Sequence, residues 1–211
     1  MTRVYLEVGK RRVFASAADW PGWTRSGKDE KLALDALAAA TPRYAQVAKA
    51  ARIAFAPGTG FEVVERLPGD ATTEFGAPGA IAKSESKRLT KKEAGRLSAL
   101  VAASWTVLDR VVETAPTSLR KGPRGGGRDR DAIVDHVLGA ETMYARKLGL
   151  RLQQPDPGDA AALREFRNEI VAGLRSGTKR VTERGWPARY AARRMAWHVL
   201  DHAWEIEDRA T

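Results

Sequence analysis

Apolar residues recur at helical spacing from Thr90 to the end of the chain, and this pattern constrains the fold more than any other feature. The capping-box sequence Thr90-Lys91-Lys92-Glu93 predicts where the first of these helices begins. Three more helices are predicted, over residues 129–149, from 159 onward and over 188–209. Four helices with short to moderate connections favour an antiparallel four-helix bundle.

The first 75 residues have a mixed pattern instead. Thr41 and Pro42 have the form of a helix N-cap followed by a first-turn proline. Short β-rich segments and helix-like segments alternate along this part of the chain. The predicted strands cover residues 4–8, 12–17 and 61–65, and the predicted helices cover 29–40 and 43–51.

These two patterns meet in a segment that has neither. Residues 76–89 begin with small residues, contain proline and glycine and lack periodicity, which is typical of a linker. The predicted fold class is therefore α+β, with a small α+β module at residues 1–75, a linker at 76–89 and a four-helix bundle at 90–211.

The composition limits the chemistry. Cysteine is absent from the 211 residues, so disulfides, thiolate-zinc sites and cysteine nucleophiles are excluded, and any metal must be held by nitrogen and oxygen ligands. No stretch approaches the length needed to span a bilayer, and the N-terminus lacks the apolar run of a signal peptide. We expect a soluble, cytoplasmic protein without membrane contact.

The chain is strongly basic, with a formal net charge of +10 and a sequence pI near 10.1. Such a charge favours acidic partners, among them nucleic acid, phosphorylated metabolites and carboxylates. The abundance of Ala, Arg and Gly is also typical of GC-rich bacterial genomes, where part of the basic excess is compositional. Nucleic-acid binding therefore stays open as an alternative.

All three histidines, His136, His198 and His202, fall in predicted helices of the C-terminal half. His198 and His202 are four residues apart and so project about 40° apart on one side of the last helix. His136 shares the apolar face of the second helix with Ile133 and Met143. A single inward histidine is usually a satisfied core residue, but three on two helices favour a metal site.

A site of three neutral imidazoles leaves the ion its full Lewis acidity and open positions for water or substrate. Zinc is the first candidate, and nickel, iron or manganese also fit imidazole ligation. Glu205 is a candidate general base or an acceptor that orients a histidine, unless it is only an exposed partner of Arg209. Asp135 and Asp201 point about 100° away from the histidines and are not expected to be ligands.

A basic, glycine-rich segment precedes the second helix. Residues 120–130 carry five cations, of which Arg124 and Arg128 are the candidates for holding an anionic cofactor or substrate. The alternative is a solvated, flexible loop. The segment lacks the spacing of a Walker loop or of a dinucleotide fingerprint, so it predicts no nucleotide.

Residues 90–211 resemble the DinB/YfiT-like superfamily in the order of their four helices and in the positions of their histidines. One histidine lies on the second helix, in His136-Val137-Leu138-Gly139-Ala140-Glu141-Thr142-Met143-Tyr144, and a His-x-x-x-His pair lies on the last helix. The resemblance implies a metal triad of His136, His198 and His202. It further implies a metal-dependent enzyme that acts on a small molecule. Its members include transferases and isomerases that use a low-molecular-weight thiol such as mycothiol, and detoxifying hydrolases. A homodimer is possible.

The segment Phe14 to Gly27, which contains Trp20-Pro21-Gly22-Trp23, is followed by an Ala/Leu-rich helix and resembles the HicB-like fold. This resemblance implies a small α+β module in which a strand ends in a Pro-Gly turn and is followed by a second strand and a helix. It does not imply an RNA-binding or antitoxin role. Trp20 and Trp23 either cover the junction between the two halves or stack on a ligand base. For the whole chain we predict a metal-dependent enzyme, with a basic nucleic-acid- or protein-binding module as the alternative.

Overall fold

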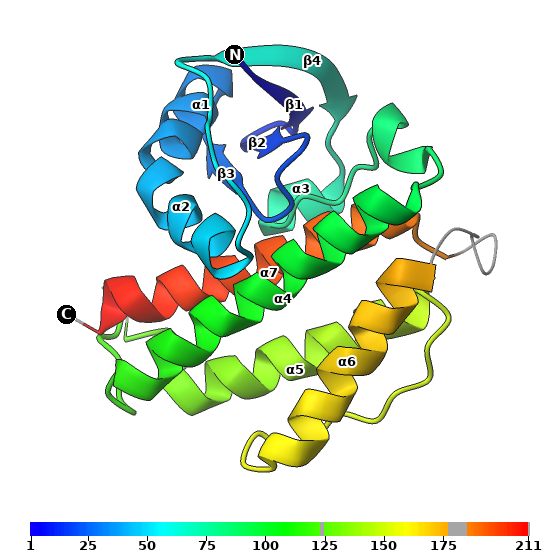
Figure 1. Ribbon diagram of the computed structural model, residues 1–211. Helices are drawn as coiled ribbons and strands as arrows, with labels where there is room; N and C mark the ends of the chain where they lie inside the picture. The colour runs from blue at the N-terminus through cyan, green and yellow to red at the C-terminus, as the bar shows by residue number, and fades with distance from the viewer. Residues whose placement is uncertain (123–124, 177–184, 211) are drawn as a thin grey trace.

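A four-stranded mixed sheet forms the N-terminal part of the computed structural model, which describes residues 1–122, 125–176 and 185–210 (Figure 1). The strands follow the order β3-β2-β1-β4; β1 is antiparallel to β2 and parallel to β4. Strand β3 follows the Pro21-Gly22 turn, where the HicB-like resemblance implies a second strand before the helix; periodicity alone does not predict it, because this short edge strand is polar and only its first residue is buried. The bounds are Thr2–Val8 for β1, Val13–Ala17 for β2, Thr24–Gly27 for β3 and Phe61–Pro68 for β4.

Two helices, α1 (Glu30–Ala39) and α2 (Thr41–Ala50), connect β3 to β4, and α1 packs on β2 and β3. Asp29 caps α1, since its carboxylate accepts a hydrogen bond of 2.8 Å from the Leu32 amide. The prediction that Thr41 is an N-cap is wrong. Ala40 precedes α2 in helical conformation, and the Thr41 hydroxyl instead donates to the Ala38 carbonyl at 2.7 Å. The two helices follow one another too closely to leave an extended capping residue.

The two N-terminal tryptophans are packed rather than open to a ligand. Trp23 is 1% exposed; its ring stacks on Tyr44 at 5.6 Å and its indole nitrogen donates to the Leu37 carbonyl. Trp20 lies at the junction with the helical part, where the guanidinium of Arg96 stands 4.4 Å from its ring. Trp23 is therefore closed to a nucleic-acid base.

The opposite face of the sheet is covered by the segment that the sequence predicted to be a linker. This segment follows α3 (Ala71–Phe75) and contains the 3₁₀ helix η1 (Lys83–Ser86). The carboxylate of Glu7, on β1, accepts hydrogen bonds from the Gly79 and Ala80 amides, both at 2.9 Å. Residues 76–89 thus pack against the sheet, and they include buried side chains such as Ala82 and Glu85.

Four long helices make up the rest of the described chain, at the positions that the apolar periodicity predicts: α4 (Lys91–Thr114), α5 (Arg130–Lys147), α6 (Ala160–Ser176) and α7 (Ala188–Arg209). The predicted capping box is confirmed, because the Thr90 hydroxyl accepts from the Glu93 amide and the Glu93 carboxylate accepts from the Thr90 amide. The predicted α+β class is also confirmed. None of the described helices is long and apolar enough to cross a membrane.

Helix α7 lies between the two parts of the molecule (Figure 1). It contacts α4, α5, α6 and η1, and the ring of its Trp197 meets Phe14 of the sheet edge-on at 6.1 Å. Every residue from Tyr190 to Leu200 is buried. One apolar cluster runs from β1 and β2 through α2 and α4 to α7. A helix so enclosed must find partners for each polar side chain, and this requirement shapes the site described next.

Candidate metal centre

The structure brings His136 of α5 together with His198 and His202 of α7. One nitrogen from each ring lies within 4.8 Å of the other two. The ring centroids are 5.1 Å apart for His136 and His198, 4.9 Å for His136 and His202, and 4.7 Å for His198 and His202. Zinc–nitrogen bonds are about 2.0–2.1 Å long, so small rotations of the three rings would allow all of them to ligate one ion. We call these three residues the histidine cluster.

His198 is the most enclosed member of the histidine cluster. It is 7% exposed, and its Nδ1 atom is buried with no hydrogen-bond partner among the residues that the structure describes. A buried polar atom left without a partner costs about 1–3 kcal/mol, so a purely structural histidine would be expected to have one. An ion or a bound water would remove this cost.

Electrostatics disfavour protonation of two members of the cluster, His198 and His136. Burial, followed by the charges of His202 and His136, lowers the pKa of His198 to about 2. Burial and the charge of His202 also lower the pKa of His136. Neutral imidazole is the form that binds metal ions, so proton competition at these two rings is weak near neutral pH.

Glu205 holds His202 in one orientation. Its Oε2 atom lies 2.8 Å from Nδ1 of His202, and its Oε1 atom accepts a hydrogen bond of 2.6 Å from Arg209. With Nδ1 occupied as a donor, Nε2 of His202 carries the lone pair that a metal would use. The hydrogen bonds from His202 and then Arg209 lower the pKa of Glu205. These contacts favour the role of Glu205 as an acceptor that orients His202 over the role of general base. The predicted contact between Glu205 and Arg209 is also present.

The neighbouring aspartates lie outside the cluster, as their helical positions predict. Asp201 forms an ion pair of 2.8 Å with Arg25. Asp135 accepts a hydrogen bond of 2.7 Å from Gln154. Neither carboxylate belongs to the group of potential ligands that the described residues provide.

Of the two arginines predicted to bind an anion, Arg124 lies outside the described residues. Arg128 is exposed, and its positive charge contributes to lowering the pKa of both His136 and His198, which places it near the cluster. Arg194, one turn before His198 on α7, contributes to the same effect on His198. The surroundings of the cluster are therefore electropositive.

The histidine cluster is enclosed at His198 and half-buried at His136 and His202. His136 and Met143 are seven residues apart and share one stripe of α5. Met143 is 63% exposed, so the prediction that it packs inward is wrong. Tyr144 lies on the enclosed side, with its ring edge-on to His198 at 5.7 Å.

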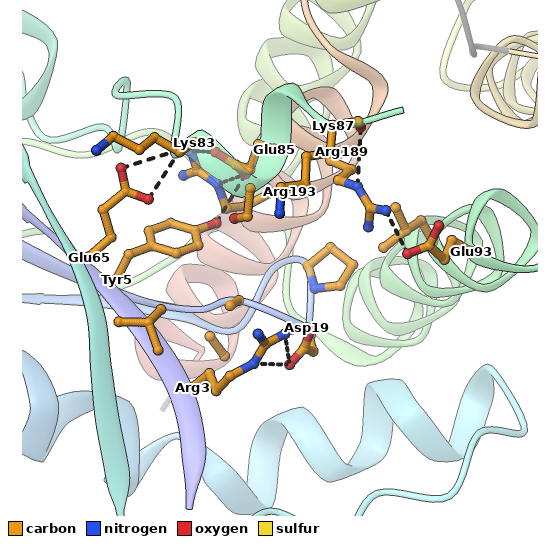
Figure 2. A pocket seen from close by; sticks show the side chains of 16 residues that line it. Arg3, Tyr5, Asp19, Glu65, Lys83, Glu85, Lys87, Glu93, Arg189 and Arg193 are labelled. Atoms are coloured by element: carbon orange, nitrogen blue, oxygen red, sulfur yellow. Dashed lines mark hydrogen bonds and ion pairs between the residues drawn. The ribbon is translucent and has the colours of Figure 1, made fainter. Parts of the chain in front are cut away.

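A second polar cluster, which no sequence pattern predicts, lies between the two halves of the molecule (Figure 2). Tyr5 of β1 and Arg193 of α7 converge on Glu85 of η1: the tyrosine hydroxyl donates to Glu85 at 3.0 Å, and the Arg193 Nε atom donates at 2.6 Å. We call these three residues the seam cluster. They line a cleft of about 430 Å³ with exposed ion pairs on its rim, including Arg3 with Asp19. The partners are too far apart in sequence for any motif to predict them.

Fold and site together define an α+β protein with a three-histidine cluster suited to a divalent cation. No protein-family model matches the chain, no curated protein matches it, and no solved structure matches it.

Proposed function

We propose that this protein is a metal-dependent enzyme that binds one divalent ion through His136, His198 and His202 and acts on a small molecule. The observation that carries the proposal is the buried Nδ1 atom of His198, which has no hydrogen-bond partner in the described part of the chain and lies inside a group of three convergent imidazoles. Zinc is the first candidate for the ion, and nickel, iron or manganese suit the same ligands.

Three protein ligands leave coordination positions for a water or a substrate atom, which is typical of catalytic rather than structural sites. A bound divalent ion would supply Lewis acidity, which lowers the pKa of a coordinated water or thiol. The chain's own residues supply the rest. Glu205 fixes the ring of His202, and the half-buried rings of His136 and His202 mark the side from which a substrate would reach the ion. The positive charge of Arg128 favours an anionic substrate or cosubstrate.

We place the chain, as part of this proposal, in the DinB/YfiT-like superfamily over residues 90–211, with a HicB-like module before it. The order of α4 to α7, with one histidine on α5 and His-x-x-x-His on α7, supports the first assignment. The strand, turn and helix order from β2 to α1 supports the second. This placement suggests a thiol-dependent transferase or isomerase, with a thiol such as mycothiol as cosubstrate, or a detoxifying hydrolase.

Elemental analysis of protein purified without chelator tests the metal site. We expect close to one divalent ion per chain in the wild type and almost none in His198→Ala, because that change removes the most enclosed ligand. Asp201→Asn is the matched control. It alters a neighbouring residue of α7 that faces Arg25 instead of the cluster, and it should retain the ion.

Metal-free wild-type protein that also fails to take up added zinc would contradict the proposal. Retention of the ion in His198→Ala would contradict it as well. If the protein instead binds heparin or DNA with a steep salt dependence that His198→Ala leaves unchanged, the basic binding module becomes the better description.

A further inference from the structure

Arg209, near the end of α7, is the centre of a hydrogen-bond network that the metal proposal does not use. Its Nη1 atom donates to the carboxylate of Glu205 at 2.6 Å. Its Nε and Nη2 atoms donate to the backbone carbonyls of Arg120 and Arg128, at 2.9 and 2.8 Å. All three guanidinium nitrogens are thus engaged, one with α7 and two with the basic loop, which we define as residues 120–130 excluding 123–124.

This network ends at a metal-ligand candidate. Arg209 holds Oε1 of Glu205, and Oε2 of the same carboxylate holds Nδ1 of His202. A carboxylate fixed at one oxygen has less freedom to rotate, so it holds the imidazole more firmly through the other. The described residues therefore form a continuous chain of contacts from the basic loop through Arg209 and Glu205 to His202.

The glycines of the loop show how closely it fits against Arg209. Gly127 has φ +115°, and a Cβ atom built there would lie 2.7 Å from Nη2 and 2.9 Å from Cζ of Arg209. Any side chain at position 127 would displace the guanidinium. At Gly126, by contrast, no atom lies within 4 Å of such a Cβ. The requirement for glycine at 127 thus follows from contact with Arg209 as well as from backbone conformation.

We infer that Arg209 is a positioning residue: it docks the basic loop onto the end of α7 and, through Glu205, sets the orientation in which His202 binds the metal. The inference rests on the proposed metal site and adds to it a coupling between loop conformation and metal affinity. It also gives the loop a role that does not require an anion. Arg209 does not belong to the group of potential metal ligands and acts on it through Glu205.

Titration of metal-free protein with cobalt(II), followed by its visible absorption, tests the inference. Replacing partners that orient metal ligands typically lowers metal affinity about 10- to 100-fold. We expect a loss in this range for Arg209→Met, together with a changed cobalt spectrum, because His202 is no longer held in one orientation. Arg209→Lys keeps the charge near Glu205 and should recover part of the affinity.

The loop contact is tested separately with Gly127→Ala. This change should lower cobalt affinity in the same direction as Arg209→Met. Gly125→Ala is the control, because Gly125 also has a positive φ, +72°, but no described atom lies within 4 Å of a Cβ built there, and it should bind cobalt like the wild type. Thermal melting of each metal-free variant identifies any general loss of folding. If Arg209→Met does not fold, Gly127→Ala against Gly125→Ala still decides the question.

A double-mutant cycle tests whether Arg209 acts through Glu205. We expect the variant carrying both Arg209→Met and Glu205→Gln to bind cobalt about as well as Glu205→Gln alone, since the two changes break one chain of contacts. The inference is overturned if Arg209→Met binds cobalt with wild-type affinity and spectrum while His198→Ala loses binding. Failure of the wild type itself to bind cobalt would instead overturn the proposed metal site, and the role of Arg209 with it.

Discussion

The seam cluster and the histidine cluster both include buried polar side chains of α7. They differ in whether hydrogen bonds from the protein satisfy those side chains. In the seam cluster, Glu85 accepts from Tyr5, from Arg193 and from the Ala82 amide. Of the Arg193 nitrogens, only Nη1 has no hydrogen-bond partner among the described residues. The Cζ atom of this guanidinium lies 5.3 Å from the ring centroid of Tyr5 and 4.9 Å from that of Tyr190. In the histidine cluster, three convergent rings leave Nδ1 of His198 unpartnered within the described structure.

This difference separates a polar cluster that holds the fold together from one that is suited to a ligand. The seam cluster joins β1, η1 and α7, and its charges neutralise one another. The histidine cluster has three convergent imidazoles, and among the described residues no carboxylate belongs to this group of potential ligands; Glu205, which contacts His202, is already engaged on both oxygens. Protein contacts complete the first cluster, whereas a cation would complete the second.

Breaking the seam cluster should give the largest change in stability. Glu85→Ala leaves the guanidinium of Arg193, which is 3% exposed, without its carboxylate. Removing one partner of a buried ion pair typically costs about 3–5 kcal/mol. We expect a loss in this range in the free energy of unfolding by urea, with one metal ion per chain still bound in the folded protein. A loss below about 1 kcal/mol would show that the seam cluster does not hold the halves together.

A third buried group sharpens the comparison, because among the described residues it has a buried atom without a hydrogen-bond partner but does not belong to a group of potential metal ligands. Glu141 of α5 accepts a hydrogen bond from Trp105, and its Oε2 atom has no partner in the described structure. Burial raises the pKa of Glu141 from 4.5 to about 7. The folded state therefore favours the protonated carboxyl, and stability is lost as the pH rises from about 4.5 through 7.

Glu141→Gln should remove this pH dependence. Relative to the wild type, we expect its free energy of unfolding to rise by about 3 kcal/mol between pH 4 and pH 8. Urea unfolding of both proteins at several pH values measures the difference. Metal content should not change, since Glu141 is not part of the histidine cluster. A constant difference across this pH range would show that Glu141 ionises normally in the folded protein.

The rim of the seam cleft should contribute least. Arg3 and Asp19 form an ion pair of 2.8 Å, but their side chains are 57% and 52% exposed. Exposed pairs contribute about 0–1 kcal/mol. We expect Asp19→Ala to lower the free energy of unfolding by less than 1 kcal/mol, and the effect should shrink further in high salt. An effect as large as that of Glu85→Ala would remove the distinction between the buried cluster and its rim.

Local sequence patterns were sufficient to predict where most of the helices lie. The capping box at Thr90 located the start of α4, and the predicted helix over 129–149 contains α5, which Gly149 follows with φ +84°. Periodicity missed β3, α3 and η1, which are short. The conformations of β3 and η1 depend on what they pack against, whereas α3 has local signals that a closer prediction could use: Asp70 caps its start, and Gly76, with φ +117°, follows its end.

By itself, the sequence determined that metal ligands must be nitrogen or oxygen atoms and that His198 and His202 share one side of a helix, because both follow from residue identity and a 3.6-residue repeat. Only the tertiary structure decided that His136 meets them, that Glu85 and Arg193 pair across the seam, and that Arg209 joins the loop to Glu205. These contacts link residues far apart in the chain, and they exist because packing α7 between the sheet and the other helices leaves each buried polar group few possible partners.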